Sequence, residues 1–359
     1  MNKKITITSL FMVIFLISLG ILLPKTLQSS YAVSTTFADT IMNLASTSAC
    51  NAGGTGVCAT NSYTDTDSTT KYHDYRFRGA DPNNYVSFNN DIYRVIGVFD
   101  SNSHGVEGKY LVKLIRSRIL GDYSWSVYNT TNTSGTYSSY KNDWTGNTTG
   151  VKANANVLLN EFFYNKTDTS STYGKCSSWT YYSDGNSYKT FSCSDIIGHG
   201  IDSNLRDYIE EVTWYLKGYK DYSYSKQNFY LCERGLSTDT TNCMSANSGA
   251  YDASTTSKIG LMYVSDYLYA SSYFADTATT TASSYYYGNK NWLYKGPEWT
   301  ITPKVNSANN AFYVYRSGSV DSTYVAYYGT GVRPTFYLKS NVNVTGGSGT
   351  FDDPYTLSM

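Results

Sequence analysis

The side chains able to carry acid–base chemistry are few in this chain of 359 residues. It holds three histidines, and His104 and His199 each precede a glycine in short polar stretches that are typical of turns. His73 stands next to Asp74, which could orient its ring, but the local sequence offers no nucleophile. No G-x-S-x-G, H-E-x-x-H, P-loop or EF-hand pattern occurs. The sequence therefore predicts no catalytic residue.

The glutamates leave one enzymatic alternative open. Six are present: Glu107, Glu161, Glu210, Glu211, Glu233 and Glu298. A glycosidase needs two carboxylates about 5–9.5 Å apart in space, a condition that sequence spacing does not test. The composition favours a non-catalytic protein, with an enzyme acting on carbohydrate or peptide as the alternative.

Aromatic residues gather in a loop region from Asp266 to Glu298. The side chains that stand out there, with one just after it, are Tyr285, Tyr286, Tyr287, Trp292 and Trp299. Exposed aromatic rings among small polar residues make contact surfaces for sugar rings or protein partners. We expect these five residues to bind the ligand. The alternative for Trp292 and Trp299 is that they are core residues.

An export signal precedes everything else. Lys3 and Lys4 are followed by the uncharged run from Ile5 to Leu23. A membrane-spanning helix needs about 20 residues and a cleavable apolar region has about 7–15, so the length favours a retained anchor. The lysines then place the body outside, at the cell membrane. The alternative is that the body is secreted after cleavage near Ala32, because Ser30 and Ala32 supply the small residues that a signal peptidase needs.

Charge and cysteine content restrict the partners of the body. Without residues 1–32, which carry three lysines and no acid, the formal net charge is −3. Nucleic acid is therefore not an expected partner, because it rewards concentrated positive charge. Six cysteines form three local pairs, which we expect to be disulfides in an exported chain, with free buried thiols the alternative: Cys50 with Cys58, Cys176 with Cys193, and Cys232 with Cys243. Because no C-x-x-C or histidine cluster accompanies them, we expect no metal and no cofactor.

Periodicity and turn residues predict an α+β body. Residues 33–70 are rich in Ser, Thr, Ala and Gly and indicate a stalk, so the folded domain would span 71–359. The pattern predicts two early strands at 85–88 and 91–99, joined by an Asn-Asn turn. Two helices are expected, at 154–164 and 204–217. The strands expected to close the domain, as an antiparallel meander, are 311–315, 320–328 and 332–338.

Four segments carry a resemblance to known proteins: GADPNNYVSFNNDIYRVIGVF (79–99), KNDW (141–144), EWTITP (298–303) and GVRPTFYLK (331–339). Together they resemble a group of uncharacterised secreted or membrane-tethered proteins of low-GC Gram-positive bacteria. The order of early strands, two helices, long loop and closing meander also resembles the C-type-lectin-like fold. The Glu-Pro-Asn and Trp-Asn-Asp motifs of calcium-dependent lectins are missing, so the resemblance implies no calcium site.

The sequence as a whole predicts a non-catalytic surface module. We expect it to bind a glycan or a protein at the cell surface. Two alternatives stay open, a cell-envelope enzyme and a structural envelope component.

Overall fold

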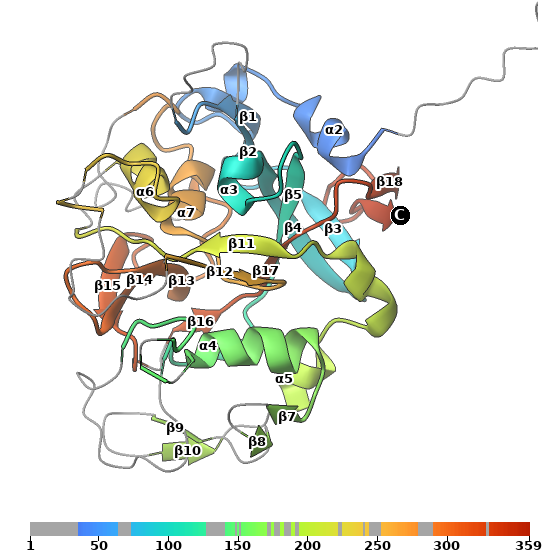
Figure 1. Ribbon diagram of the computed structural model, residues 1–359. Coiled ribbons are helices and arrows are strands. Elements are labelled where there is room, and N and C mark those ends of the chain that lie inside the picture. Colours follow the sequence, from blue (N-terminus) through green and yellow to red (C-terminus); the bar gives the residue numbers. More distant parts are fainter. Residues whose placement is uncertain are drawn as a thin grey trace, which may run out of the picture. The chain divides into compact units, whose positions relative to one another are not determined.

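Two sheets carry the α+β fold of the computed structural model (Figure 1). The residues described are 35–63, 73–126, 141–147, 149–150, 152–170, 174–175, 180–182, 188–190, 194–221, 225–239, 241–243, 253–278, 290–327 and 330–359. Thr36–Met359 form one folded unit. The predicted anchor lies outside the described residues, and none of the helices within them is long and apolar enough to cross a membrane.

The first sheet is antiparallel throughout. Its strands are, in spatial order, β1 (Gly56–Thr60), β2 (Asp74–Arg78), β4 (Asp91–Phe99), β5 (Leu111–Arg116) and β17 (Thr335–Tyr337), and β3 (Tyr85–Phe88) also pairs with β4. The predicted strands 85–88 and 91–99 are confirmed. Asn89 and Asn90 turn the chain between them with φ of 57° and 55°, a conformation that asparagine tolerates and that matches the twist of a two-residue hairpin.

The second sheet comes largely from the C-terminal part of the chain. Its order is β15 (Val320–Tyr324), β14 (Asn310–Val314), β13 (Glu298–Pro303), β16 (Gly331–Val332) and β6 (Gly121–Asp122). The expected pairing of the first two meander strands is confirmed. The third is wrong, because the chain leaves this sheet after β16 and joins the first sheet as β17. Pro334 lies at the crossing, where its missing N–H costs no ladder hydrogen bond.

Helices are short in the described part of the chain. They are α2 (Phe37–Met42), η1 (Ser48–Cys50), α3 (Ser101–His104), α4 (Asn154–Val157), α5 (Ser194–Gly198), η5 (Ser203–Tyr208), α6 (Lys226–Glu233) and α7 (Val264–Ala270). Helix α4 continues directly into the π-helical segment η3 (Leu158–Tyr164), which confirms the predicted helix at 154–164.

The second predicted helix, 204–217, is wrong. A short 3₁₀ turn, η5, is followed by strand β11 (Val212–Tyr215), which pairs with β12 (Ser254–Ser257). Val212 and Trp214 are buried on one face of the strand while its alternate residues are half-buried. Apolar residues here fit a period of two as well as the helical period, and the β-branched and aromatic side chains favour the strand.

Three further hairpins complete the list of strands. They are β7 (Thr169–Ser170) with β8 (Gly174–Lys175), β9 (Thr180–Tyr182) with β10 (Tyr188–Thr190), and β18 (Asn343–Gly346) with β19 (Thr356–Ser358).

Residues 36–63 belong to the folded unit, which corrects the predicted stalk at 33–70. Helix α2 starts with a capping box formed by Thr36 and Asp39, and β1 pairs with β2 along its whole length. The composition was misleading because small polar residues serve as helix caps and turns as well as linkers.

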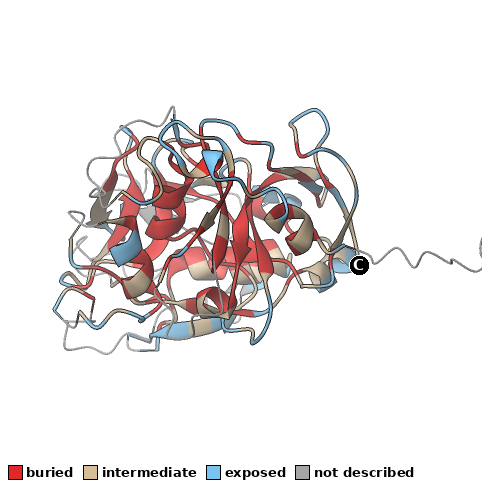
Figure 2. Cartoon of the chain, turned by 90° about the horizontal axis from the view of Figure 1, so that it is seen from above, coloured by how far each residue is buried: buried red, intermediate tan, exposed pale blue. Residues whose placement is uncertain are grey.

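The core is a cluster of buried residues that come from both sheets and from α4, η3 and α7, and Figure 2 shows the buried segments gathered in the interior. Large aromatic side chains fill much of it, including the fully buried Trp125, Trp214, Trp292 and Trp299. Tyrosine is therefore partly a core residue in this protein, as Tyr93, Tyr230 and Tyr337 show.

Candidate functional site

The two tryptophans of the predicted contact surface are core residues. Trp292 is 1% exposed, and its indole N–H donates to the carbonyl oxygen of Phe77 at 2.8 Å. Trp299 is fully buried and donates to the carbonyl oxygen of Tyr123 at 2.8 Å. Since both indole N–H groups are satisfied internally, neither ring is presented to a ligand. Tyr285, Tyr286 and Tyr287 lie outside the described residues.

Two of the three predicted disulfides are present. Cys50 is bonded to Cys58 and Cys232 to Cys243, with Cα–Cα distances of 5.0 and 4.9 Å. The third predicted pair, Cys176 with Cys193, lies outside the described residues.

The histidines are placed differently from what local sequence indicated. His104 is fully buried at the end of α3. His73 turns to Asp100, with Nδ1 3.3 Å from the carboxylate, and stacks on Tyr63 at a centroid distance of 3.8 Å. Asp74, its sequence neighbour, instead binds Arg76 at 3.0 Å. No group of His, Cys, Asp or Glu suited to holding a metal ion occurs among the residues described.

A buried charge network links β2, β5 and α7. Asp266 accepts from Lys113 at 2.6 Å and from Arg76 at 3.3 Å, and all three side chains are buried. Burial lowers the pKa of Lys113 to about 8, although the neighbouring carboxylate acts in the opposite direction. Burial also opposes ionisation of Asp266, but Lys113 and Arg76 outweigh it and hold its pKa below the usual range.

A second buried ion pair lies beside this network. Glu233 accepts from Arg234 at 2.6 Å, from Ser265 Oγ at 2.5 Å and from Thr302 Oγ1 at 2.6 Å. The rings of Tyr230 and Tyr263 pack on the guanidinium, at 4.3 and 3.9 Å. Because these charges are sealed from solvent and paired with one another, they tie the two sheets and α6 together rather than face a substrate.

The best candidate for a ligand site is a polar groove of about 590 Å³ between η3 and β12. Its lining combines carboxamides, hydroxyls and few charges: Thr145, Asn147, Lys152, Asn156, Asn160, Tyr164, Asn165, Glu211, Ser254, Thr255, Thr256, Ser257 and Lys258. In Figure 1, β12 crosses the molecule beside the long helix labelled α4.

The helical wall of the groove presents a regular stripe. Asn156, Asn160 and Tyr164 follow one another at intervals of four residues along α4 and η3, and Lys152 lies at the same interval just before α4; all four line the groove. Asn160 fixes the distance between the walls, because its amide donates to the carbonyl oxygen of Ile259 at 2.9 Å and accepts from the Ile259 N–H at 3.1 Å. A π-helical turn is uncommon and is often found at functional sites.

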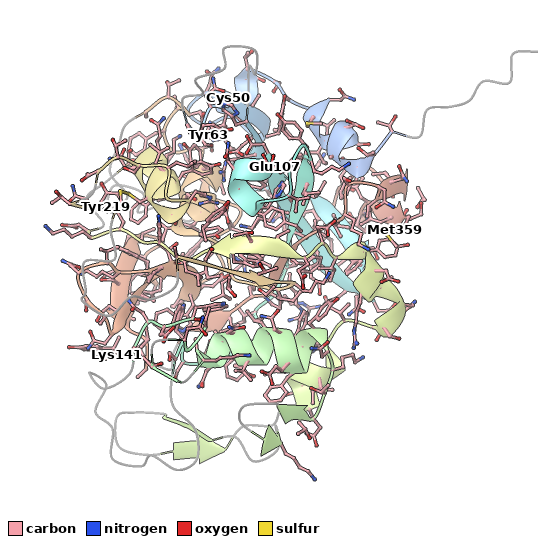
Figure 3. All side chains as sticks on the ribbon, viewed as in Figure 1. Cys50, Tyr63, Glu107, Lys141, Tyr219 and Met359 are labelled. Atoms are coloured by element: carbon pink, nitrogen blue, oxygen red, sulfur yellow. A yellow bond between two sulfur atoms is a disulfide. The ribbon has the colours of Figure 1, made fainter. Side chains whose placement is uncertain are left out.

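The end wall is formed by Thr145 and Asn147, which follow the KNDW segment (141–144) directly, and side chains of that segment anchor this part of the chain. The Asn142 amide donates to the carbonyl oxygens of three residues of the second sheet region: Lys304, Ser307 and Asn310. Asp143 accepts from the N–H groups of Gly146 and Thr149 at 3.0 and 2.9 Å. Figure 3 labels Lys141, the first residue of the segment, near the N-terminal end of α4. This wall is therefore preorganised.

The other motifs that carried the resemblance are structural. Arg333 of GVRP donates to Glu298 of EWTITP at 2.7 Å and to the carbonyl oxygen of Leu293 at 2.7 Å. Arg94 donates to Asp81 at 2.7 Å and to Asn84 at 2.6 Å, all within GADPNNYVSFNNDIYRVIGVF. These pairs join separate segments of the chain and do not line the polar groove.

A smaller groove of about 350 Å³ lies over β1 and the C-terminal loop. Its floor is apolar, formed by Val57, Phe77 and Tyr355. Asp81 is the one charged side chain in the lining that the structure describes, and its carboxylate already accepts from Arg94 and from Tyr85. This groove is lined by fewer polar side chains than the first.

Comparisons of the chain with protein-family models, with curated proteins and with solved structures returned no match. The groove therefore has to be interpreted from its own chemistry.

Sequence reasoning missed the groove residues. The signal that could have indicated one wall is the four-residue spacing of Asn156 and Asn160 inside the predicted helix. The hydroxyl run at 254–257 could not be matched to that helix without the fold, since about a hundred residues separate the two.

Proposed function

We propose that the body is a non-catalytic surface module that binds a glycan or a protein in the polar groove between η3 and β12. The observation that supports it most is the lining, in which amide and hydroxyl groups converge on one cavity between rigid walls. Such groups give orientation and specificity through hydrogen bonds. Glu211 is the single carboxylate in the lining that the structure describes, which disfavours the alternative of a glycosidase that needs two.

The location and the finer fold belong to the same proposal. The N-terminal run would hold the protein in the cell membrane with the body outside, or the body would be released after cleavage near Ala32. Protease added to intact cells should then remove the body, and recovery of the chain in the cytosol would refute export. The C-type-lectin-like resemblance is supported by the mixed α+β architecture with mostly antiparallel sheets.

A glycan array tests the proposal with two matched variants. Thr256→Trp places a large side chain at an exposed position of the groove, and Thr345→Trp makes the same change at an exposed position of β18, remote from the lining. We expect Thr256→Trp to lose the array signals and Thr345→Trp to keep them, with both variants melting near the wild-type temperature. Equal binding by the wild type and both variants would show that the groove is not the ligand-binding site.

A general hydrolase screen on the wild-type protein tests the alternative. Turnover that Glu211→Gln abolishes would favour an envelope enzyme. If no glycan binds on the array, no substrate is turned over in the screen and no peptide is enriched from a display library, a structural envelope component would be favoured.

A further inference from the structure

Strand β12 has one edge without a partner strand in the described part of the chain. It pairs with β11 in a register that runs from Ser257 opposite Val212 to Ser254 opposite Tyr215. The other edge faces the groove, whose lining includes all four residues of β12. An unpaired edge is a template for another strand.

The register shows which backbone groups lie on that edge. The N–H of Leu216 donates to the carbonyl oxygen of Ala253 at 2.8 Å, so these two opposed residues form a hydrogen-bonded pair. Such pairs alternate in an antiparallel ladder, which directs the groups of Thr255 and Ser257 toward β11. The N–H and C=O groups of Ser254 and Thr256 then point to the opposite edge, into the groove. We call these four groups the free edge.

The opposite wall leaves a channel beside the free edge. Asn160 of the opposite wall clamps the chain just beyond β12, where its side-chain amide makes both a donated and an accepted bond to the backbone of Ile259. The clamp closes the channel at the Ile259 end. Toward Ser254 the channel continues between the strand and the residues Lys152 and Asn156 of the helical wall.

From this geometry we propose that the groove takes an extended polypeptide segment, which adds to the free edge of β12 as a further strand. The proposal rests on the proposed function and narrows its ligand from a glycan or protein to a polypeptide. Donor and acceptor pairs that recur every second residue match the backbone of another strand. A glycan has no such repeat, and Tyr164 is the one aromatic ring available for stacking in the described lining.

The charges of the lining restrict the sequence of the segment. Lys152, Lys258 and Glu211 are its charged side chains. Lys152 lies 3.5 Å from Glu161, which offsets part of its charge. A segment that is uncharged or carries one acidic residue therefore fits, whereas a basic segment is repelled.

The test uses a display library of random peptides against the full-length chain in detergent micelles. Enriched peptides are synthesised, and their affinity is measured by fluorescence anisotropy for the wild type and two variants. Thr256→Pro removes the N–H from the free edge but no bond to β11, and proline is tolerated at such edge positions. Thr256→Ala removes the side chain and leaves the backbone unchanged, which makes it the matched control.

We expect Thr256→Pro to weaken peptide binding about tenfold or more, because it removes a backbone bond and places a ring in the path of the strand. Thr256→Ala should bind within about threefold of wild type, a change smaller than one hydrogen bond contributes. A strand presents its N–H groups to a given edge at every second residue. N-methylation of every second peptide residue should therefore abolish binding when it falls on the residues whose N–H groups face β12, and should be tolerated on the other set. Unchanged melting temperatures show that neither variant unfolds β12.

Three results would overturn the inference. They are undiminished binding by Thr256→Pro, equal losses in both variants, and a library that enriches no peptide. If Thr256→Trp also abolishes signals on the glycan array, the proposed function would stand in each of these cases, with a glycan and not a polypeptide as the ligand of the groove. Failure of both probes would reject the two proposals together.

Discussion

The pH dependence of stability should report on a single buried histidine. His104 accepts a hydrogen bond at Nδ1 from the N–H of Val106 at 3.1 Å, and its Nε2 lies 3.0 Å from the carbonyl oxygen of Phe99. A carbonyl can only accept, so Nε2 carries the proton and Nδ1 must stay bare. The ring is therefore held neutral, and burial, aided by Lys113, lowers its pKa to about 4 despite the bond to Phe99.

The sign and size of the effect follow from the two pKa values. In the unfolded chain a histidine titrates near 6.5, so between that pH and about 4 the unfolded state binds a proton that the folded state does not. The free energy of unfolding should therefore fall as the pH falls through this window and should not change with His104 above it. At about 1.4 kcal/mol per pKa unit, the loss between about pH 7.5 and 4.5 is roughly 2.5 kcal/mol.

Urea unfolding of the wild type and of His104→Asn across this pH range measures the contribution of His104 to the pH dependence of the free energy of unfolding. Asparagine can still accept from the Val106 N–H but does not replace the imidazole ring, so this variant should be less stable than the wild type at neutral pH. Because asparagine cannot become charged, the free energy of unfolding of the variant should fall by roughly 2.5 kcal/mol less on acidification. Carboxylates titrate in both proteins and cancel in the difference. The control His199→Asn changes an exposed ring and should keep the wild-type slope. Parallel curves for wild type and His104→Asn would refute the reasoning.

Three further outcomes follow from the described contacts. Trp292→Ala should cost about 3–5 kcal/mol in urea unfolding, because it empties a core position, and a ligand-binding defect with an unchanged melting temperature would contradict that placement. Asn142→Ala removes the side-chain donor to three carbonyl oxygens, each of which keeps a backbone N–H donor, and should cost about 1–3 kcal/mol; a loss within experimental error would show that water replaces the amide. Non-reducing peptide mapping should recover Cys232 linked to Cys243, and finding either as a free thiol would disprove the bond.

Local chemistry explains which elements the sequence could predict. The first hairpin was predictable because Asn89 and Asn90 supply the turn themselves, whatever the rest of the chain does. Local pairing likewise identified the two described disulfides. The predicted helix at 204–217 failed because Val212 and Leu216 satisfy both periodicities, and the partner strand lies about forty residues farther along.

The candidate site depended on information that side-chain identity does not carry. Trp292 and Trp299 stood out in the sequence, yet the backbone carbonyl groups that accept from their indole N–H groups belong to Phe77 and Tyr123, which are far away in the sequence. The proposed site instead depends on the edge of β12 that has no partner strand among the described residues. Sequence reasoning follows side chains, so it could identify aromatic residues but could not locate a strand edge.

The composition of β12 fits an edge that is kept open for one partner. Exposed edges promote aggregation, and proteins shorten, charge or cover them to avoid it. Strand β12 has four residues, all of them serine or threonine, which lowers its tendency to join a second sheet. The helical wall with Asn160 stands across a groove of about 590 Å³ from it, and in our proposal a single extended chain lies in that groove along the edge. A groove that only bound sugars would gain nothing from this arrangement, whereas a strand-adding site requires an edge that is both accessible and too short to pair with copies of itself.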